Sequence, residues 1–374
     1  MTVLLVTISL HAQRGGGTAE RTRQLALHLT ALGTTCEVAT MEDGGYADAL
    51  RAAGIPIHVT GYVKVRFPLP FINPLALYRL VRRVDRVHIL GYWYLLSVAT
   101  ARMARALGRP YVLSAAGEFA KLTAPRRTAR AFHRLVGLSL IRHAATLIAI
   151  TPLERRQIEA HFDVAPAVVV IPNGVSVPAP RATVPVEARR TLVFVGRLAP
   201  IKGPDLLLEA FAAIAPRHPE IDLVMAGPDF GLQTSLAARV AELGLGSRVV
   251  LAHYVDEPAR TALFDRALLA CVPSRAEAMS LVALEAGAAG VPVLLTDQCG
   301  FDDVAAIDGG AVVPATVAGL TDGLERLLAD RGALAAKGRR LRDHISAHYA
   351  WPTVSAALRD HLAALPDGPD RGQS

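Results

Sequence analysis

Short apolar runs of strand length alternate with helix-length segments along almost the whole chain, and this alternation limits the possible fold more than any other feature. Runs such as 3–9, 35–40 and 86–90 are short and mainly apolar, whereas 19–32 and 95–107 carry apolar residues at helical spacing. Strands that alternate with helices form βαβ units around parallel sheets. The sequence therefore predicts an α/β fold.

The alternation stops at residues 172–190, which are rich in Pro, Val and Ala, and then restarts. The further strands are expected at 57–60, 111–114, 146–150 and 167–171, and then at 192–196, 221–226, 249–251, 268–272 and 291–296. A chain of 374 residues suffices for two domains of ~150–200 residues each. We therefore expect two doubly wound, Rossmann-like domains that face each other across a cleft, with ligands at the carboxyl ends of the strands.

The predicted domain boundaries follow from this break. We expect an N-terminal domain at 1–171, a linker at 172–190 and a C-terminal domain at 191–343. A last helical region, 344–365, contains Trp351-Pro352, which must kink or break it, and is expected to return to the N-terminal domain. Residues 366–374 are rich in Pro, Gly and Asp and are expected to form a frayed tail.

The composition excludes several classes of protein. Cys36, Cys271 and Cys299 are odd in number and show no metal-binding spacing, so we expect free buried thiols in a reducing cytosol. The first strand is too short for a signal-peptide core and lacks a basic region before it. No apolar stretch reaches the ~18–20 residues that a membrane span needs. We expect a cytoplasmic protein that is soluble or lies on a membrane surface.

The net charge of +7 is distributed unevenly between the two halves. Residues 1–171 carry 21 Lys and Arg against 10 Asp and Glu, whereas residues 172–374 carry 19 against 23. A basic half indicates a phosphate-rich partner, such as nucleic acid, an anionic lipid or a phosphorylated acceptor. The alternative is an Arg-rich composition spread over solvated faces.

Two segments, Phe67–Val84 and Pro125–Leu147, interleave these arginines with apolar side chains. A basic amphipathic helix of this kind can lie on an anionic membrane surface. The alternative for each is a helix packed on the core with a solvated basic face. Since no recognition motif accompanies the charge, we do not expect nucleic acid as a partner.

Two glutamates, Glu277 and Glu285, stand eight residues apart around the start of a predicted helix at 282–289. Glu277 is expected in the preceding loop and Glu285 about one turn into the helix. The N–H groups near 279–281 would then point into the cleft and could bind a phosphate, with one carboxylate on either side for sugar hydroxyls. The alternative is a loop glutamate favoured by the helix dipole and a surface glutamate.

Two further motifs follow the first strand of each domain. In the C-terminal domain, Gly196 allows close approach of a ligand. Arg197 and Lys202 place two cations in the loop after the same strand, as a diphosphate requires. In the N-terminal domain, Arg14 precedes three glycines at 15–17, whose N–H groups can approach phosphate. Exposed loop charges and a flexible turn are the respective alternatives.

Together these motifs resemble the family-4-type retaining glycosyltransferases of the GT-B fold, which act in bacterial polysaccharide and lipopolysaccharide biosynthesis. The resemblance covers essentially the whole chain. Its most specific part is the pair Glu277 and Glu285 with Ser274-Arg275 before it. Further matches are Gly196-Arg197, Lys202-Gly203, Asn173-Gly174-Val175, Ala226-Gly227-Pro228 and Gly290-Val291-Pro292-Val293.

The resemblance implies a nucleotide-sugar donor, UDP- or GDP-linked, used without a metal or another cofactor, and the chain contains no Asp-x-Asp. It also implies that Arg197 and Lys202 bind the diphosphate, that Glu277 contacts the transferred sugar and that Glu285 contacts the ribose. The implied donor-binding residues are Gly16, Gly17, Gly196, Arg197, Lys202, Tyr254, Val255, Glu277, Met279, Ser280, Leu281, Val282 and Glu285. The implied acceptor is a glycan or a lipid-diphosphate-linked molecule.

The chain departs from the family pattern at two places. Ala278-Met279-Ser280 stands where the family often has Gly-Phe-Gly, and Ala116 stands where members often carry an active-site histidine. Glu118 and His88 are therefore further catalytic candidates, with a core histidine as the alternative for His88. The change at Ala116 keeps open a non-catalytic donor-binding or scaffold protein.

A sugar-nucleotide epimerase on the same fold is a third possibility, against which the two glutamates with Arg197 and Lys202 argue. The base and the sugar of the donor stay open, because a few loop contacts decide both.

Overall fold

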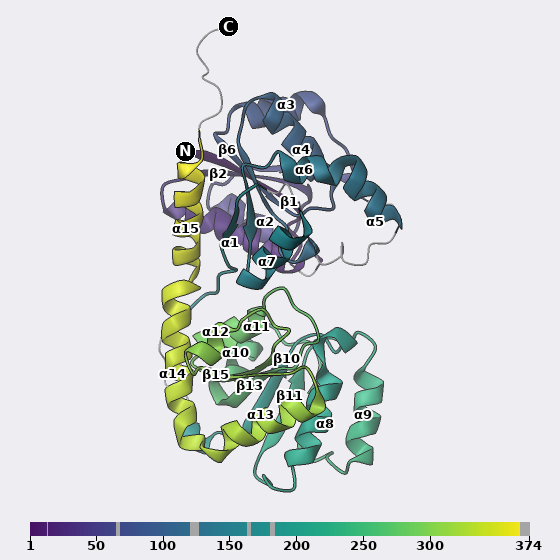
Figure 1. The fold of residues 1–374 in the computed structure, drawn as a ribbon, viewed down its shortest axis with the longest axis vertical. Coiled ribbons are helices and arrows are strands. Elements are labelled where there is room, and N and C mark those ends of the chain that lie inside the picture. Colours follow the sequence, from purple (N-terminus) through teal and green to yellow (C-terminus); the bar gives the residue numbers. More distant parts are fainter. Residues whose placement is uncertain (13, 65–67, 120–126, 163–165, 180–183, 367–374) are drawn as a thin grey trace. The chain divides into compact units, whose positions relative to one another are not determined.

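The computed structural model describes residues 1–12, 14–64, 68–119, 127–162, 166–179 and 184–366. The chain forms two compact units (Figure 1). Unit 1 comprises Met1–Gly174 and the chain from Trp351 onwards, and unit 2 comprises Val175–Ala350.

Unit 1 contains a seven-stranded parallel sheet of order β3-β2-β1-β6-β7-β8-β9. Its strands are β1 (Thr2–Ser9), β2 (Thr35–Glu42), β3 (Ile57–Val59), β6 (Arg86–Leu90), β7 (Tyr111–Ser114), β8 (Thr146–Ala149) and β9 (Val168–Val170). Its helices are α1 (Gly16–Ala31), α2 (Gly45–Ala52), α3 (Pro74–Arg82), α4 (Leu95–Ala106), α5 (Arg127–Phe132), α6 (Leu138–Arg142), α7 (Pro152–His161) and α15 (Trp351–Ala364). A short antiparallel pair, β4 (Tyr62–Val63) and β5 (Leu69–Pro70), lies outside the sheet.

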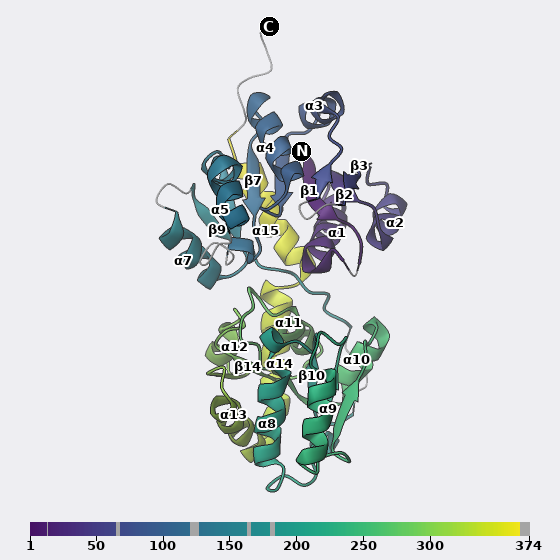
Figure 2. The same ribbon diagram turned by 90° about the vertical axis from the view of Figure 1, so that its right-hand side faces the viewer.

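Most residues on both faces of this sheet are buried, which explains why its strands are mainly apolar. Successive side chains of a strand point to opposite faces. Val3 and Leu5 of β1 accordingly pack with α1, α2 and α15, whereas Leu4 and Val6 pack with α3, α4, α6 and α7. Figures 1 and 2 show α15, in yellow, running along unit 1.

Unit 2 contains a six-stranded parallel sheet of order β12-β11-β10-β13-β14-β15. Its strands are β10 (Thr191–Val195), β11 (Asp222–Ala226), β12 (Val249–Ala252), β13 (Ala267–Val272), β14 (Val293–Thr296) and β15 (Gly310–Val313). Its helices are α8 (Pro204–Ile214), α9 (Gln233–Glu242), α10 (Glu257–Arg266), α11 (Leu281–Ala288), α12 (Asp303–Ala306), α13 (Val317–Ala329) and α14 (Arg331–His348). The apolar core under α8, α9 and α13 fills one face, and α11 packs with α14 (Figure 2).

The predicted pair of doubly wound parallel sheets is thus confirmed. The unit boundaries differ from the expected ones. Residues 175–179 and 184–190 belong to unit 2, and residues 344–348 complete α14 instead of opening the terminal helix. The helix breaks at Tyr349 and Ala350, just before Trp351-Pro352, and α15 joins unit 1. The frayed tail predicted at 366–374 lies, except for its first residue, outside the described residues.

Trp351, the first residue of α15, packs against Gly174 within unit 1. A Cβ atom added to Gly174 would lie 2.3 Å from the Trp351 ring, so only glycine fits there. Trp351 also stacks on His28 of α1. The predicted free, buried cysteines are confirmed, and burial raises the pKa of Cys36 and Cys299 to about 11.

The two basic segments form α3 and a helical run through α5, a π-helical turn (His133–Gly137) and α6. Each packs on the core through its apolar side, with Leu77, Leu80, Leu140 and Ile141 buried. Residues 67, 125 and 126 of the predicted segments lie outside the described residues. Across the part of the chain that the structure describes, every helix is too short or too polar to cross a bilayer.

Candidate active site

The strand order of unit 2 fixes where a ligand can bind. From β10 the chain proceeds outward to β11 and β12, and from β13 it proceeds the other way, so the order reverses between β10 and β13. In open α/β sheets, ligands bind at the carboxyl ends of the two strands at such a switch point. The loops that follow β10 and β13 carry Lys202 and Glu277, which the sequence had singled out.

The loop after β13 holds Glu277 by several hydrogen bonds. The Glu277 N–H donates to the Gln298 carbonyl at 2.8 Å, and the Ser274 hydroxyl donates to the Glu277 carboxylate. Ser274 is itself fixed, because the Thr296 hydroxyl donates to its carbonyl. The Glu277 side chain is only 9% exposed. The carboxylate is therefore held in one orientation before any ligand binds.

Lys202 and Glu277 form an ion pair, with Nζ and Oε1 2.8 Å apart. Lys202 reaches this place because Gly203 turns the chain at φ +66°, where a Cβ atom would lie 2.0 Å from the Pro273 carbonyl oxygen. The Lys202 side chain is 23% exposed. The cation and the carboxylate predicted to bind different parts of the donor thus form an ion pair with each other.

A second ion pair ties the two loops together. The Arg275 guanidinium binds both oxygens of Asp205, at 2.8 and 2.6 Å, and donates to the Pro200 carbonyl at 2.6 Å. The Arg275 N–H donates to the Ile201 carbonyl at 2.8 Å. The pKa of Asp205 is lowered: burial raises it, but the hydrogen bonds and charge of Arg275 outweigh that effect. These contacts fix the Lys202 loop against the Glu277 loop.

Helix α11 begins at Leu281, with Ser280 as its N-cap. The Ser280 hydroxyl accepts from Ala283 N at 3.3 Å, so the N–H groups of Leu281 and Val282 are the ones for which the helix supplies no acceptor. The Ser280 N–H donates to the Cys299 carbonyl at 3.0 Å, and Ser280 and Met279 are buried. We predicted that the N–H groups at 279–281 are available to a ligand, and this is wrong for Ser280. The available N–H groups at the start of the helix are those of Leu281 and Val282.

Glu285 lies in the second turn of α11 and pairs with Arg260 of α10, with Oε2 and Nε 3.1 Å apart. The two side chains are 29% and 33% exposed, so a ligand can reach them. Sequence reasoning missed Arg260, because 25 residues separate it from Glu285 and no motif marks it.

Arg197 and Tyr254, two further donor-site candidates of unit 2, are exposed. Arg197, after Gly196 and β10, lies with its guanidinium carbon 5.2 Å from the centre of the Phe230 ring. Lys202, in contrast, reaches Glu277. Tyr254 is 65% exposed in the loop after β12, and Val255 beside it is half-buried. A planar nucleobase could stack on such an exposed aromatic ring.

In unit 1, the glycine-rich turn opens α1. The helix begins at Gly16 rather than at the expected Ala19, and no side chain caps it. Gly16, with φ +55°, and Gly17 are exposed. Their N–H groups have no acceptor within the helix, which leaves them available to an anion.

His88 is a core histidine. It is the third residue of β6, fully buried, and its Nε2 lies 2.8 Å from the Ser114 hydroxyl. Burial, and then the charge of Arg21, lowers its pKa to about 3. The prediction that His88 ends a strand and contacts the substrate is wrong, because both faces of β6 are covered.

Glu118 lies beside Ala116 in the loop after β7. Its carboxylate accepts from Tyr92 N at 2.6 Å and from the Tyr94 hydroxyl at 3.2 Å, so it braces the loop after β6. Ala116, where the family often has histidine, has φ +46°, a left-handed conformation that is unfavourable for alanine. Glu118 is partly exposed and is the catalytic candidate of unit 1 that the geometry retains.

Comparison with known protein families shows which family the chain belongs to. Residues 16–174 match the family described as "Glycosyl transferase 4-like domain", and residues 179–344 match "Glycosyl transferases group 1". The chain belongs to these glycosyltransferases. The resemblance inferred from Glu277, Glu285 and their neighbours is thereby confirmed.

A curated relative of this glycosyltransferase chain is D-inositol 3-phosphate glycosyltransferase of Gordonia bronchialis. It is 34% identical over 269 residues, which cover 64% of this chain and 58% of that protein. The same-named protein of Nocardia farcinica is 33% identical over 246 residues, 60% of this chain and 54% of that protein. The chain thus matches a little over half the length of these relatives.

Among solved structures, Anabaena HepE in complex with UDP has a TM-score of 0.76 at 19% identity, covering 98% of this chain and 100% of that one. HepE has also been solved with UDP-glucose. Sucrose-phosphate synthase of Thermosynechococcus elongatus has a TM-score of 0.74 at 18% identity, covering 98% and 99%. These likenesses show the GT-B fold predicted from the sequence.

Proposed function

We propose that the protein is a glycosyltransferase that moves a sugar from a UDP- or GDP-linked donor to a glycan or lipid-diphosphate-linked acceptor. The observation that carries this proposal is the Lys202–Glu277 ion pair at the switch point of unit 2. The relatives named as glycosyltransferases support the activity, and the UDP-glucose complex of HepE supports a nucleotide-sugar donor, with UDP favoured.

In the proposed mechanism the donor exchanges partners with this ion pair. The diphosphate competes with Glu277 for the Lys202 ammonium, and Arg197 and the first N–H groups of α11 supply further positive potential. Glu277, relieved of its cation, accepts hydrogen bonds from the sugar hydroxyls.

When the bond between the anomeric carbon and the diphosphate oxygen breaks, negative charge grows on the leaving nucleotide. Lys202 and Arg197 stabilise this charge as it forms, which lowers the barrier. These two cations take the role that a metal has elsewhere, and this supports a metal-independent reaction. Retention of the anomeric configuration is proposed from the family resemblance.

We also propose that unit 1 works at an anionic membrane surface on the cytoplasmic side. Residues 61–150 contain 15 Lys and Arg but only two acids, Asp85 and Glu118. Phe71, Leu75 and Leu135 are 62%, 54% and 77% exposed. Cations beside exposed apolar side chains suit a surface with phosphate groups above and acyl chains below.

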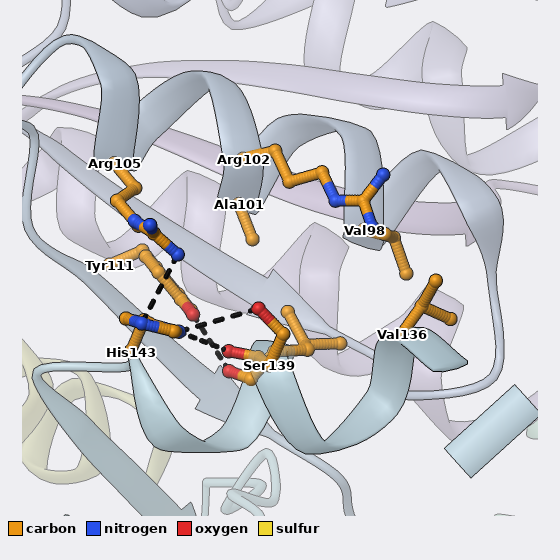
Figure 3. A pocket seen from close by; sticks show the side chains of 9 residues that line it. Val98, Ala101, Arg102, Arg105, Tyr111, Val136, Ser139 and His143 are labelled. Atoms are coloured by element: carbon orange, nitrogen blue, oxygen red, sulfur yellow. Dashed lines mark hydrogen bonds between the residues drawn. The ribbon is translucent and has the colours of Figure 1, made fainter. Parts of the chain in front are cut away.

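A pocket between α4 and α6 brings apolar side chains and arginines together (Figure 3). Its apolar lining includes Val98 and Val136, and Arg102 and Arg105 line its edge. His143 Nδ1 lies 2.9 Å from the Ser139 carbonyl oxygen, which requires a proton on Nδ1 and leaves Nε2 to accept from Arg105 at 3.1 Å. Within the described residues, neither arginine pairs with a carboxylate.

A second candidate function is a donor-binding scaffold without turnover. Ala116 favours it, because an alanine there cannot take over the chemistry of a histidine, and His88 is too buried to replace it. Glu118 is the proposed alternative group in unit 1.

Binding and slow hydrolysis of UDP-, GDP-, ADP- and dTDP-sugars, with chelator present, test the donor assignment in the unmodified chain and in Lys202→Ala and Glu285→Ala. We expect selective binding and slow release of one nucleotide, both lost in the two variants. Binding without turnover favours the scaffold, and no binding of any donor refutes the donor site.

Vesicle sedimentation tests the membrane surface. We expect the protein to sediment with phosphatidylglycerol-containing vesicles and not with pure phosphatidylcholine, and Arg102→Glu/Arg105→Glu to abolish this. The matched control, Arg326→Glu/Arg339→Glu in unit 2, changes the net charge equally. Equal loss in both double variants would contradict a specific surface on unit 1.

A further inference from the structure

The ion pair between Arg260 and Glu285 connects two helices of unit 2 that flank β13. Arg260 lies at the end of the first turn of α10, which precedes β13, and Glu285 lies in α11, which follows it. Their Nε and Oε2 atoms are 3.1 Å apart, and both side chains are about one-third exposed.

The place of Arg260 is unusual for an ordinary surface cation. The positive end of a helix dipole is at its N-terminus, so a guanidinium in the first turn lies against the dipole of its own helix. The Asp256 carboxylate is engaged in capping α10, accepting from Ala259 N at 2.9 Å. The contact across to α11 is therefore what favours Arg260 at this position.

Helix α10 also begins two residues after the Tyr254-Val255 loop. Helix α10 therefore connects the loop proposed to bind the base with Arg260, and Arg260 contacts Glu285, the carboxylate proposed to bind the ribose. A carboxylate has two oxygens and about four lone-pair directions, so Glu285 can keep its bond to Arg260 while it accepts from a hydroxyl.

We propose that Arg260 is a positioning residue: it holds the Glu285 carboxylate in the orientation that accepts the hydroxyl groups of the donor ribose. This inference rests on the proposed nucleotide-sugar function. Without Arg260, the Glu285 carboxylate would lose this bond and a part of its orientation, and restoring that orientation on binding would weaken the affinity.

Removal of one ribose hydroxyl from the ligand tests this role. We would measure by calorimetry the dissociation constants of UDP, 2′-deoxy-UDP, GDP and 2′-deoxy-GDP for the unmodified chain. The variants are Arg260→Gln, Arg260→Lys, Glu285→Gln and the double variant Arg260→Gln/Glu285→Gln. Arg239→Gln is the matched control, since Arg239 pairs with Glu209 of α8 in the same unit.

We expect the unmodified chain to bind the ribonucleotide roughly tenfold more tightly than its 2′-deoxy form, the size of one well-placed hydrogen bond. Arg260→Gln should remove most of this preference while leaving 2′-deoxy binding nearly unchanged, and Arg260→Lys should restore part of it. The double variant should match Glu285→Gln, and Arg239→Gln should behave as the unmodified chain.

Equal weakening of both nucleotide forms by Arg260→Gln, or additive effects in the double variant, would overturn the positioning role and leave the donor site intact. If the unmodified chain binds none of the four nucleotides, the proposed function fails and this inference fails with it.

Discussion

Replacing Lys202 by methionine should lower the free energy of unfolding, because it leaves the Glu277 carboxylate without its cation. Breaking a fully buried pair costs ~3–5 kcal/mol, and an exposed pair contributes ~0–1 kcal/mol. Glu277 is 9% exposed and Lys202 23%, and the Ser274 hydroxyl still binds the carboxylate. We therefore expect a loss of about 1–2 kcal/mol, between these limits.

A double-mutant cycle isolates this term. Urea unfolding followed by circular dichroism would be measured for Lys202→Met, Glu277→Gln and Lys202→Met/Glu277→Gln. The double variant should be more stable than the sum of the single effects predicts, since it removes both charges. Arg239→Met, which breaks a more exposed pair, should leave the transition unchanged. Additivity within ~0.5 kcal/mol would refute the coupling.

The same variants should change nucleotide binding in opposite directions. Glu277→Gln releases Lys202 from its competitor, so UDP without a sugar should bind more tightly than to the unmodified chain, by roughly three- to tenfold. Lys202→Met should weaken UDP binding. If Glu277→Gln weakens UDP binding as much as Lys202→Met does, the exchange of partners is wrong.

Three further predictions follow from single positions. Gly203→Ala should lower the free energy of unfolding by more than ~2 kcal/mol and remove donor binding. The alanine Cβ would lie 2.0 Å from the Pro273 carbonyl oxygen, at φ +66°. A melting temperature equal to that of the unmodified chain would contradict this. Ala116→Gly should stabilise the protein by up to ~1 kcal/mol, because it relieves φ +46°, and denaturant titration would show a loss instead if this loop is not strained. The pKa of His88 is lowered from 6.5 to about 3, so the unfolded chain takes up a proton between these pH values that the folded chain does not. The free energy of unfolding should therefore fall by about 1.4 kcal/mol per pH unit as the pH drops through this window. The variant His88→Gln should flatten the pH profile of urea unfolding.

Much of the fold could be predicted because buried parallel strands and amphipathic helices leave strong sequence patterns. Strand Tyr111–Ser114 was predicted with the bounds that the structure shows. Strand Gly310–Val313 was missed, because two of its four residues are Gly and Ala. Helix Arg331–His348 was predicted only over its last residues, 344–348, since its N-terminal part is rich in Ala, Gly and Arg and its apolar stripe is narrow.

The candidate site was predictable only where a motif marks it. Glu277, Glu285 and Lys202 stand at fixed spacings after strands, but the pairing of Lys202 with Glu277 is a tertiary contact that no spacing reveals. His88 was misplaced because a strand buried on both faces gives no sign of which residues face a ligand.

The central claim is transfer of a sugar, and labelled product formation tests it most directly. The unmodified protein and Lys202→Ala would be incubated with UDP-[14C]glucose, or the sugar nucleotide selected by the binding panel, and a bacterial membrane extract as the acceptor source. We predict that label enters an acid-stable glycan or lipid fraction with stoichiometric release of nucleotide, only with the unmodified protein. Tight donor binding with no labelled product and no released nucleotide would contradict the account and leave the protein a donor-binding scaffold.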